Sequence, residues 1–146
     1  MTDIVDKATR SRMMANITGR NTAPELYIRH GLHKLGFRFR INDRSLKGTP
    51  DIVLKRYSAV VFVNGCFWHG HDCLYFKLPK TRQIFWSDKI ETNRKRDAKT
   101  IEILRVEGWR ICIIWECSIK NRNKDKLFLQ LEHWLKGTRK FKEIDK

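Results

Sequence analysis

Several features are missing from this sequence of 146 residues, and each absence excludes a class of protein. No apolar run approaches the roughly 20 residues that a membrane-spanning helix needs, so we expect no contact with a membrane. The opening residues, MTDIVDKATRSR, are charged and lack the apolar stretch of a secretory signal peptide. There is no internal repeat and no low-complexity linker. The sequence therefore predicts one globular domain in the cytoplasm.

Acidic residues are also scarce, with 16 Asp and Glu against 31 Lys and Arg, which gives a net charge of +15. Solubility alone is usually served by net charges on the order of 2–8, although a very soluble protein with scattered charge is the plain alternative. A basic excess of this size on a small domain favours binding to a polyanion, of which nucleic acid is the commonest.

Cysteines are few, and in the reducing cytoplasm the four that are present indicate metal ligands or buried thiols rather than disulfides. Three of them, Cys66, Cys73 and Cys117, fall near predicted strand ends or in the loop that follows, and His71 lies between the first two. Three thiolates and an imidazole form a closed tetrahedral set that is typical of structural Zn²⁺. The alternative is that the thiols are buried and His71 is hydrogen-bonded at the surface. Cys112 lies inside a predicted strand and is assigned to the core.

The hydrophobic pattern predicts an α/β domain over residues 22–137. Residues 1–21 are expected to form a polar arm or short helix, and residues 138–146 a basic tail without assignable chemistry. Thr22 and Glu25 match a capping box that begins a helix, which Gly36 ends. Further helices are predicted at 84–107 and from about 127 to Gly137, and strands at 37–43, 51–55, 59–64 and 109–117.

Strands 59–64 and 109–117 are both apolar on two faces and are joined by the long helix, so they should form a parallel βαβ unit. We expect a mixed sheet with helices on both faces. Parallel neighbours end at the same edge, which would bring the Cys and His side chains together there.

Two carboxylates are candidates for a second site. Asp51 begins a strand next to the central one, where it could bind Mg²⁺, which prefers a few hard oxygen ligands. Asp51 could equally cap the turn GTPD. Glu25 could serve only the capping box, but it also heads the apolar stripe of its helix.

His69 remains once His71 is assigned to a metal, and a neutral imidazole suits a general base. A solvated loop histidine is the plain alternative. Asn93 and Asp97 lie four residues apart on the core-facing stripe of helix 84–107, where polar groups need partners. They could support a site from behind or bind buried backbone.

Phe67, Trp68 and Trp86 place large rings around the same loop. They could form a minor core beneath it. In a basic protein they could instead enter a base stack, where the cost of unstacking is offset by contacts to the kinked duplex and is lower at a mismatch.

The segments KATRSRMMANI, NTAPE, GTPDIV, VNGCFWHGHDC, FW, NRKRD and GWRICIIWEC, in this order, resemble the very short patch repair (Vsr) endonucleases of bacteria. The resemblance runs from about residue 7 to about residue 136. It implies a restriction-endonuclease-like fold with structural zinc. It also implies a Mg²⁺-dependent nick on the 5′ side of the thymine in a T·G mismatch.

The resemblance assigns roles to individual residues. Asp51 would bind Mg²⁺, His69 would be the catalytic histidine, and Glu25 would be a further active-site acid. The zinc ligands and the DNA-inserting rings would be those named above, and Met14 in the arm would touch the other groove.

The chain departs from the family pattern where a Thr-His pair is replaced by Val63-Asn64. Val63 should suffice if the metal is bound there by a backbone carbonyl. Asn64 can hydrogen-bond a phosphate or water but carries no proton at neutral pH, so either the histidine is auxiliary or the enzyme is slower or has another target. The second half of the PD…(D/E)xK pattern of restriction enzymes is also missing, which leaves His69 and Glu25 to compensate.

Two other functions fit the residues: a strand-nicking nuclease of a restriction or mobile-element system, and a zinc-stabilised DNA-binding protein without catalysis. The protein is expected to act as a monomer, and other mismatch-repair factors are possible partners.

Overall fold

The computed structural model describes residues 22–73, 76–120 and 124–145. The predicted N-terminal arm, including Met14, lies outside the described residues.

The described residues form a five-stranded mixed sheet in the order β1-β2-β3-β4-β5. The strands are β1 (Arg40–Ile41), β2 (Ile52–Leu54), β3 (Ala59–Asn64), β4 (Arg110–Trp115) and β5 (Phe141–Ile144). The pairs β1–β2 and β2–β3 are antiparallel, whereas β3–β4 and β4–β5 are parallel. The predicted parallel pairing of the two apolar strands is thus confirmed, with Asn64 opposite Trp115 at their shared end.

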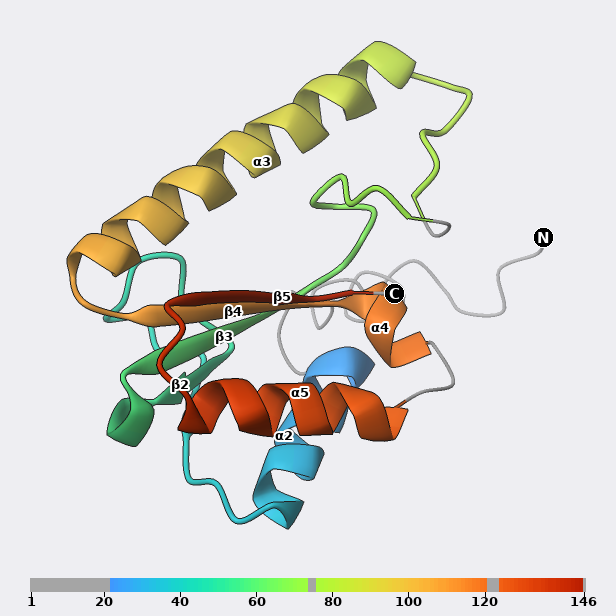
Figure 1. Cartoon of the computed structure of the whole chain (residues 1–146). Helices are drawn as coiled ribbons and strands as arrows, with labels where there is room; N and C mark the ends of the chain where they lie inside the picture. The colour runs from blue at the N-terminus through green and yellow to red at the C-terminus, as the bar shows by residue number, and fades with distance from the viewer. Residues whose placement is uncertain (1–21, 74–75, 121–123, 146) are drawn as a thin grey trace, which may run out of the picture.

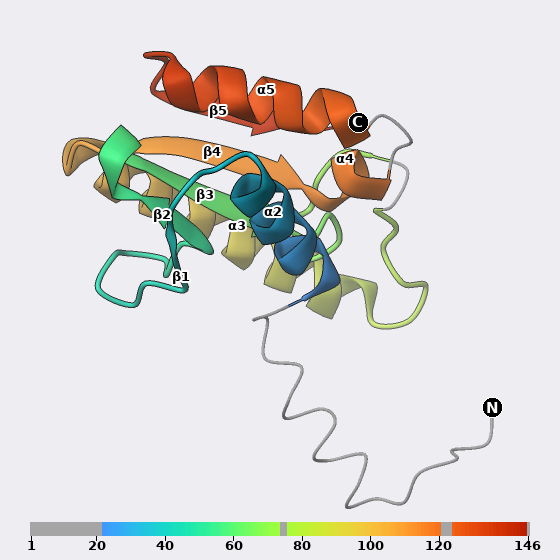
Figure 2. The same ribbon diagram turned by 90° about the horizontal axis from the view of Figure 1, so that it is seen from below.

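Helices cover both faces of this sheet (Figures 1 and 2). The long helix α3 (Gln83–Val106) lies on one face, and α2 (Ala23–Lys34) and α5 (Lys124–Lys136) lie on the other. A 3-10 turn, η1 (Lys55–Tyr57), joins β2 to β3, and a short helix, α4 (Glu116–Lys120), follows β4. The mixed α/β architecture predicted from the sequence is confirmed.

The strands β3 and β4 alternate between two cores. Val61 and Cys112 pack with α2 and α5, while Val60 and Ile111 pack beneath α3 with Leu104. This alternation is why both strands are apolar at nearly every position.

The predicted start of α2 is confirmed, because the Thr22 side chain accepts a hydrogen bond from the backbone N–H of Glu25 at 3.4 Å. Its apolar stripe is shorter than expected. Ile28 and Leu32 are fully buried, but Leu35 caps the helix and is 43% exposed.

Two predictions about extended segments were wrong. The strand expected at 37–43 pairs only over Arg40–Ile41, because Asn42 adopts a left-handed conformation (φ 49°) that ends the pairing. The segment 138–146, expected to be a basic tail, contributes β5, whose Ile144 pairs with Ile114 and is 2% exposed. A single buried isoleucine among charged residues does not make the alternating pattern that would indicate a strand.

Arg110 ties this C-terminal region to the rest of the fold. Its guanidinium donates to the backbone oxygens of Leu135 at 3.2 Å and Arg139 at 3.0 Å, and it lies over the ring of Trp134. Within the described part of the chain, no helix combines the length and apolarity needed to cross a membrane.

Candidate active site and metal centre

A cavity of about 560 Å³ opens where β3 ends and β2 begins. It is lined by the five residues assigned to the catalytic centre from the sequence, and also by Asp97: Glu25, Asp51, Val63, Asn64, His69 and Asp97. These residues come from α2, β3, α3 and the intervening loops. The antiparallel start of β2 and the parallel ends of β3 and β4 place them at one edge of the sheet.

Two carboxyl groups meet on one wall of this cavity. The Asp51 carboxylate accepts a hydrogen bond from the backbone N–H of Val63 at 2.7 Å. The pKa of Asp51 is raised to about 7, mainly by burial and also by the neighbouring Glu25 carboxyl, against the lowering effect of the Val63 N–H. Glu25 is 3% exposed and is paired with Arg29 at 3.2 Å. A cation bound between the two carboxyl groups would offset their repulsion.

The opposite wall carries an imidazole and a third carboxylate. His69 Nδ1 is hydrogen-bonded to a carboxylate oxygen of Asp97 of α3. A carboxylate at Nδ1 holds the proton on that nitrogen and leaves Nε2 as the basic atom. Asp97, which was predicted to face inward from this helix, lies against His69 at the cavity.

A second contact fixes the loop that carries His69. Asn93, which is 8% exposed, donates from Nδ2 to the backbone oxygen of Trp68 at 2.9 Å and accepts from Arg96 at 3.1 Å. The buried amide therefore binds loop backbone, which was one of the two sequence-based interpretations.

Gly70 lets the loop lie close to α3. Its φ of +62° is left-handed, and a Cβ at this position would come within 2.6 Å of Ile90 Cγ2. Any larger residue between His69 and His71 would push the loop away from the helix.

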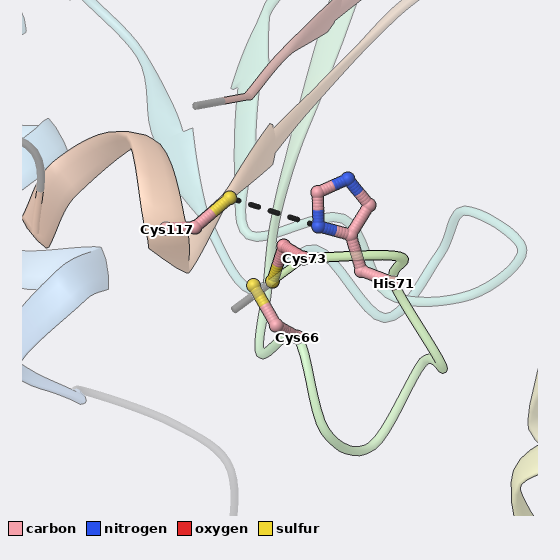
Figure 3. Close-up of side chains that lie close together, drawn as sticks. All are labelled: Cys66, His71, Cys73 and Cys117. Atoms are coloured by element: carbon pink, nitrogen blue, oxygen red, sulfur yellow. Dashed lines mark hydrogen bonds between the residues drawn. The ribbon is translucent and has the colours of Figure 1, made fainter. Parts of the chain in front are cut away.

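The four predicted metal ligands converge next to this cavity. The ligand atoms of Cys66, His71, Cys73 and Cys117 all lie within 4.8 Å of one another. Figure 3 shows three of them on the loop after β3 and Cys117 on α4, with the side chains pointing toward a common centre. Cys112 is fully buried elsewhere in the core, as predicted.

The distance between two of the ligand atoms matches that expected around a tetrahedral ion. Cys117 Sγ and His71 Nδ1 are 3.6 Å apart. Bonds of about 2.3 Å to sulfur and about 2.1 Å to nitrogen, at a tetrahedral angle, place two such ligand atoms about 3.6 Å apart. Without a cation, burial and, to a smaller extent, the neighbouring thiols raise the pKa of the Cys66 thiol to about 12. Metal binding would release these protons.

The aromatic residues form a cluster at the rim of the loop. The ring centroids of Phe67, Trp68 and Trp86 are 5.1 to 5.8 Å apart in edge-to-face contacts. Trp68 is 50% exposed, and Phe85, which packs on Trp86, is 44% exposed. The rings therefore do not form a closed minor core. Such an exposed aromatic surface is typical of an interaction site.

The structure also brings in residues that sequence reasoning missed. Arg29 pairs with Glu25, and the spacing of four residues on one helix could have indicated this ion pair from the sequence. Trp115 stacks on His71 at 4.2 Å and contacts the edge of His69 at 6.1 Å, a position that depends on the β3–β4 register. Thr100 and Arg96 line the cavity, which no local pattern indicated.

The sequence is similar to proteins that are named as DNA-cleaving enzymes. A family model described as "DNA mismatch endonuclease Vsr" matches residues 2–75. The DNA mismatch endonuclease Vsr of Escherichia coli (strain K12) is 44% identical over 99% of this chain and 95% of its own length. The type II nicking enzyme V.XorIIP of Xanthomonas oryzae pv. oryzae is 45% identical over 83% of this chain and 89% of its own length. The type II nicking enzyme V.NmeAIP of Neisseria meningitidis is 43% identical over 84% of this chain and 87% of its own length.

These similarities, together with the cavity and its carboxylates, define the protein as a DNA endonuclease. It belongs to the family of the DNA mismatch endonuclease Vsr, as the motifs in the sequence indicated.

Proposed function

We propose that this protein nicks one strand of double-stranded DNA on the 5′ side of the thymine in a T·G mismatch, with Mg²⁺ as cofactor. The observation that carries the proposal is a single cavity holding the Asp51–Glu25 carboxyl pair and the His69–Asp97 pair next to exposed aromatic rings. The E. coli relative is named for mismatch cleavage, which supports this choice of substrate. The mixed sheet is consistent with the restriction-endonuclease-like fold that the family resemblance implies.

Mg²⁺ fits the carboxyl wall of the cavity. Asp51 would hold it together with the backbone carbonyl of Val63, and Glu25 would contribute charge or bind its water. The Val63 N–H binds Oδ2 of Asp51 and so fixes this carboxyl group at the cavity wall. When bound, Mg²⁺ supplies stabilisation of negative charge on the phosphate and on the leaving oxygen.

His69 is positioned to act as the general base. Asp97 holds Nδ1, so Nε2 accepts the proton from the attacking water and Asp97 stabilises the imidazolium that forms. Asn64 is buried at the end of β3 and lines the same cavity. Its amide would orient the phosphate or a water without taking a proton.

The exposed rings of Phe67, Trp68 and Trp86 would enter the base stack at the mismatch, and Met14 would approach from the other groove. The N-terminal arm would contact DNA. A monomer suits a lesion that is asymmetric, and other mismatch-repair factors remain candidate partners.

A nicking assay tests the proposed function. Labelled duplexes that contain T·G, another mismatch or only matched pairs are incubated with and without Mg²⁺. We expect a nick 5′ of the thymine in the T·G duplex alone, and only with Mg²⁺. Equal nicking of a matched duplex would instead favour another target. The relatives from Xanthomonas oryzae and Neisseria meningitidis, named type II nicking enzymes, make this the second candidate. No cleavage under any condition would favour a DNA-binding protein without catalysis.

The Trp68→Ala variant tests the aromatic insertion. Because base stacking on an aromatic ring contributes about 1–3 kcal/mol, we expect T·G binding to weaken by roughly 5- to 150-fold. Binding to a matched duplex should change little, since phosphate contacts dominate there. Leu129→Ala, an exposed apolar position on α5, is the control. Equal losses on both duplexes would contradict insertion at the mismatch.

We further propose that Cys66, His71, Cys73 and Cys117 bind Zn²⁺ in a structural role. Stripping the ion with a strong chelator should lower Tm substantially, because a structural zinc site supplies on the order of 10 kcal/mol of folding free energy. Calorimetry of the loaded and stripped protein measures the effect. Elemental analysis of the purified protein that finds no zinc would contradict the assignment.

A further inference from the structure

The C-terminal strand β5 brings a carboxylate to the metal cluster. β5 pairs with β4 through Ile144 and Ile114, and Asp145 follows at the end where α4 and the cluster lie (Figure 1). Asp145 Oδ2 is 3.4 Å from His71 Nε2. Neither the sequence pattern nor the proposed nicking mechanism gave this residue a role.

His71 is contacted from three directions. Its Nδ1 faces Cys117 Sγ at 3.6 Å, which makes Nδ1 the nitrogen directed at the ligand cluster (Figure 3). One face of its ring lies against Trp115, with the ring planes only 9° apart. The remaining nitrogen, Nε2, lies 3.4 Å from a carboxylate oxygen of Asp145. The imidazole side chain is 12% exposed, so few other partners can reach it.

We propose that Asp145 is a positioning residue of the metal centre, which binds the Nε2–H of His71 and directs Nδ1 at the ion. This inference rests on the proposed metal assignment of the four-residue cluster. A carboxylate behind a metal-binding histidine fixes the tautomer and the ring orientation and makes the imidazole a stronger ligand. Stacking on Trp115 keeps the His71 ring from tilting out of its plane. Asp145 would determine which of the two ring nitrogens faces the cluster.

The exposure of His71 and Asp145 distinguishes a metal-positioning role from an ordinary surface ion pair. The Asp145 side chain is 45% exposed, so its attraction to a charged histidine would by itself add little to stability. A neutral histidine bound to a metal needs an acceptor for its second N–H, and Asp145 is the residue placed to provide it. The effect should therefore appear in metal retention and be absent from the metal-free protein.

The experiment compares zinc-loaded full-length protein with the variants Asp145→Asn, Asp145→Glu and Glu143→Gln. Glu143 is an exposed carboxylate on the same strand and serves as the matched control. The rate of zinc transfer to a chromogenic chelator is measured for each variant, and Tm is measured before and after the zinc is stripped. The zinc content of the unmodified protein is determined first, because its absence would overturn the metal assignment itself.

We expect Asp145→Asn to release zinc about 10-fold faster, since loss of such a carboxylate typically costs 10–100-fold in metal affinity. Its Tm should fall when zinc is bound and match the unmodified protein when zinc is removed. Asp145→Glu should largely restore retention, and Glu143→Gln should behave as the unmodified protein. Two results would overturn the proposal: zinc release from Asp145→Asn at the rate of the unmodified protein, or an equal fall in Tm with and without zinc. Asp145 would then be an ordinary surface residue at the end of β5.

Discussion

Replacing His69 with alanine should lower the nicking rate by about 10²–10⁴-fold, the contribution typical of a positioned general base. The protein should remain folded, because the polar contact that the substitution removes is a single one, between His69 and Asp97 of α3. Single-turnover nicking of the T·G duplex measures the loss, and the melting temperature confirms folding. A fully active His69→Ala variant would remove this residue from the mechanism.

The Asp97→Asn variant tests whether His69 and Asp97 act as one catalytic pair or as two independent residues. Asparagine keeps the shape of the side chain but cannot stabilise the imidazolium, so we expect a loss of roughly 10²-fold or more. Groups that act as a unit are strongly non-additive. The double variant with His69→Ala should therefore be no slower than His69→Ala alone. Additive losses would place Asp97 in a separate role.

Replacing Asp51 with asparagine should abolish Mg²⁺-dependent nicking and at the same time stabilise the metal-free protein. The pKa of Asp51 is raised to about 7 in the folded state, mainly by burial. Between about pH 4 and pH 7 the unfolded chain loses this proton while the folded chain keeps it. Rising pH therefore destabilises the fold through this window, and the penalty is complete above pH 7. Asparagine carries no charge and avoids the penalty.

Thermal unfolding without Mg²⁺ measures this effect at acidic and alkaline pH. We expect Asp51→Asn to raise Tm above pH 7 by roughly 5 °C or more, and to change it little near pH 4. Asp43→Asn is the matched control. Asp43 is an exposed aspartate that accepts hydrogen bonds from Ser45, so its pKa is lowered and its replacement should not stabilise. A lower Tm for Asp51→Asn above pH 7 would contradict the buried-charge account.

The parallel βαβ unit could be predicted because its signals are local and strong. Two six-residue strands, β3 and β4, are apolar on both faces, and a 24-residue helix joins them. Once these strands are parallel, the ends that carry Cys66 and Cys117 must meet, which is why the metal cluster followed from the sequence. The carboxylates of the cavity and His69 lie at this same edge of the sheet.

Other parts could not be predicted, because they depend on partners far along the chain. β5 exists only because β4 offers a free edge, and its sequence carries a single buried residue, Ile144. The contacts of Asp145 and Trp115 with His71 depend on that pairing and on strand register. The sequence placed Asp97 on the inner stripe of α3, but its partner His69 is 28 residues away in the chain and could be identified only from the folded geometry.

The helix that carries Asp97 is only loosely held. Of the 24 residues of α3, only Ile90, Asn93, Thr100 and Leu104 are buried. With so little apolar anchorage, we expect this helix to open locally at a free energy below that of global unfolding, so that its amides exchange hydrogen early. Warming the enzyme should then separate the Asp97 carboxylate from the His69 imidazole before the sheet and the metal cluster unfold. Thermal inactivation then measures the docking of one helix, whereas Tm measures the whole fold.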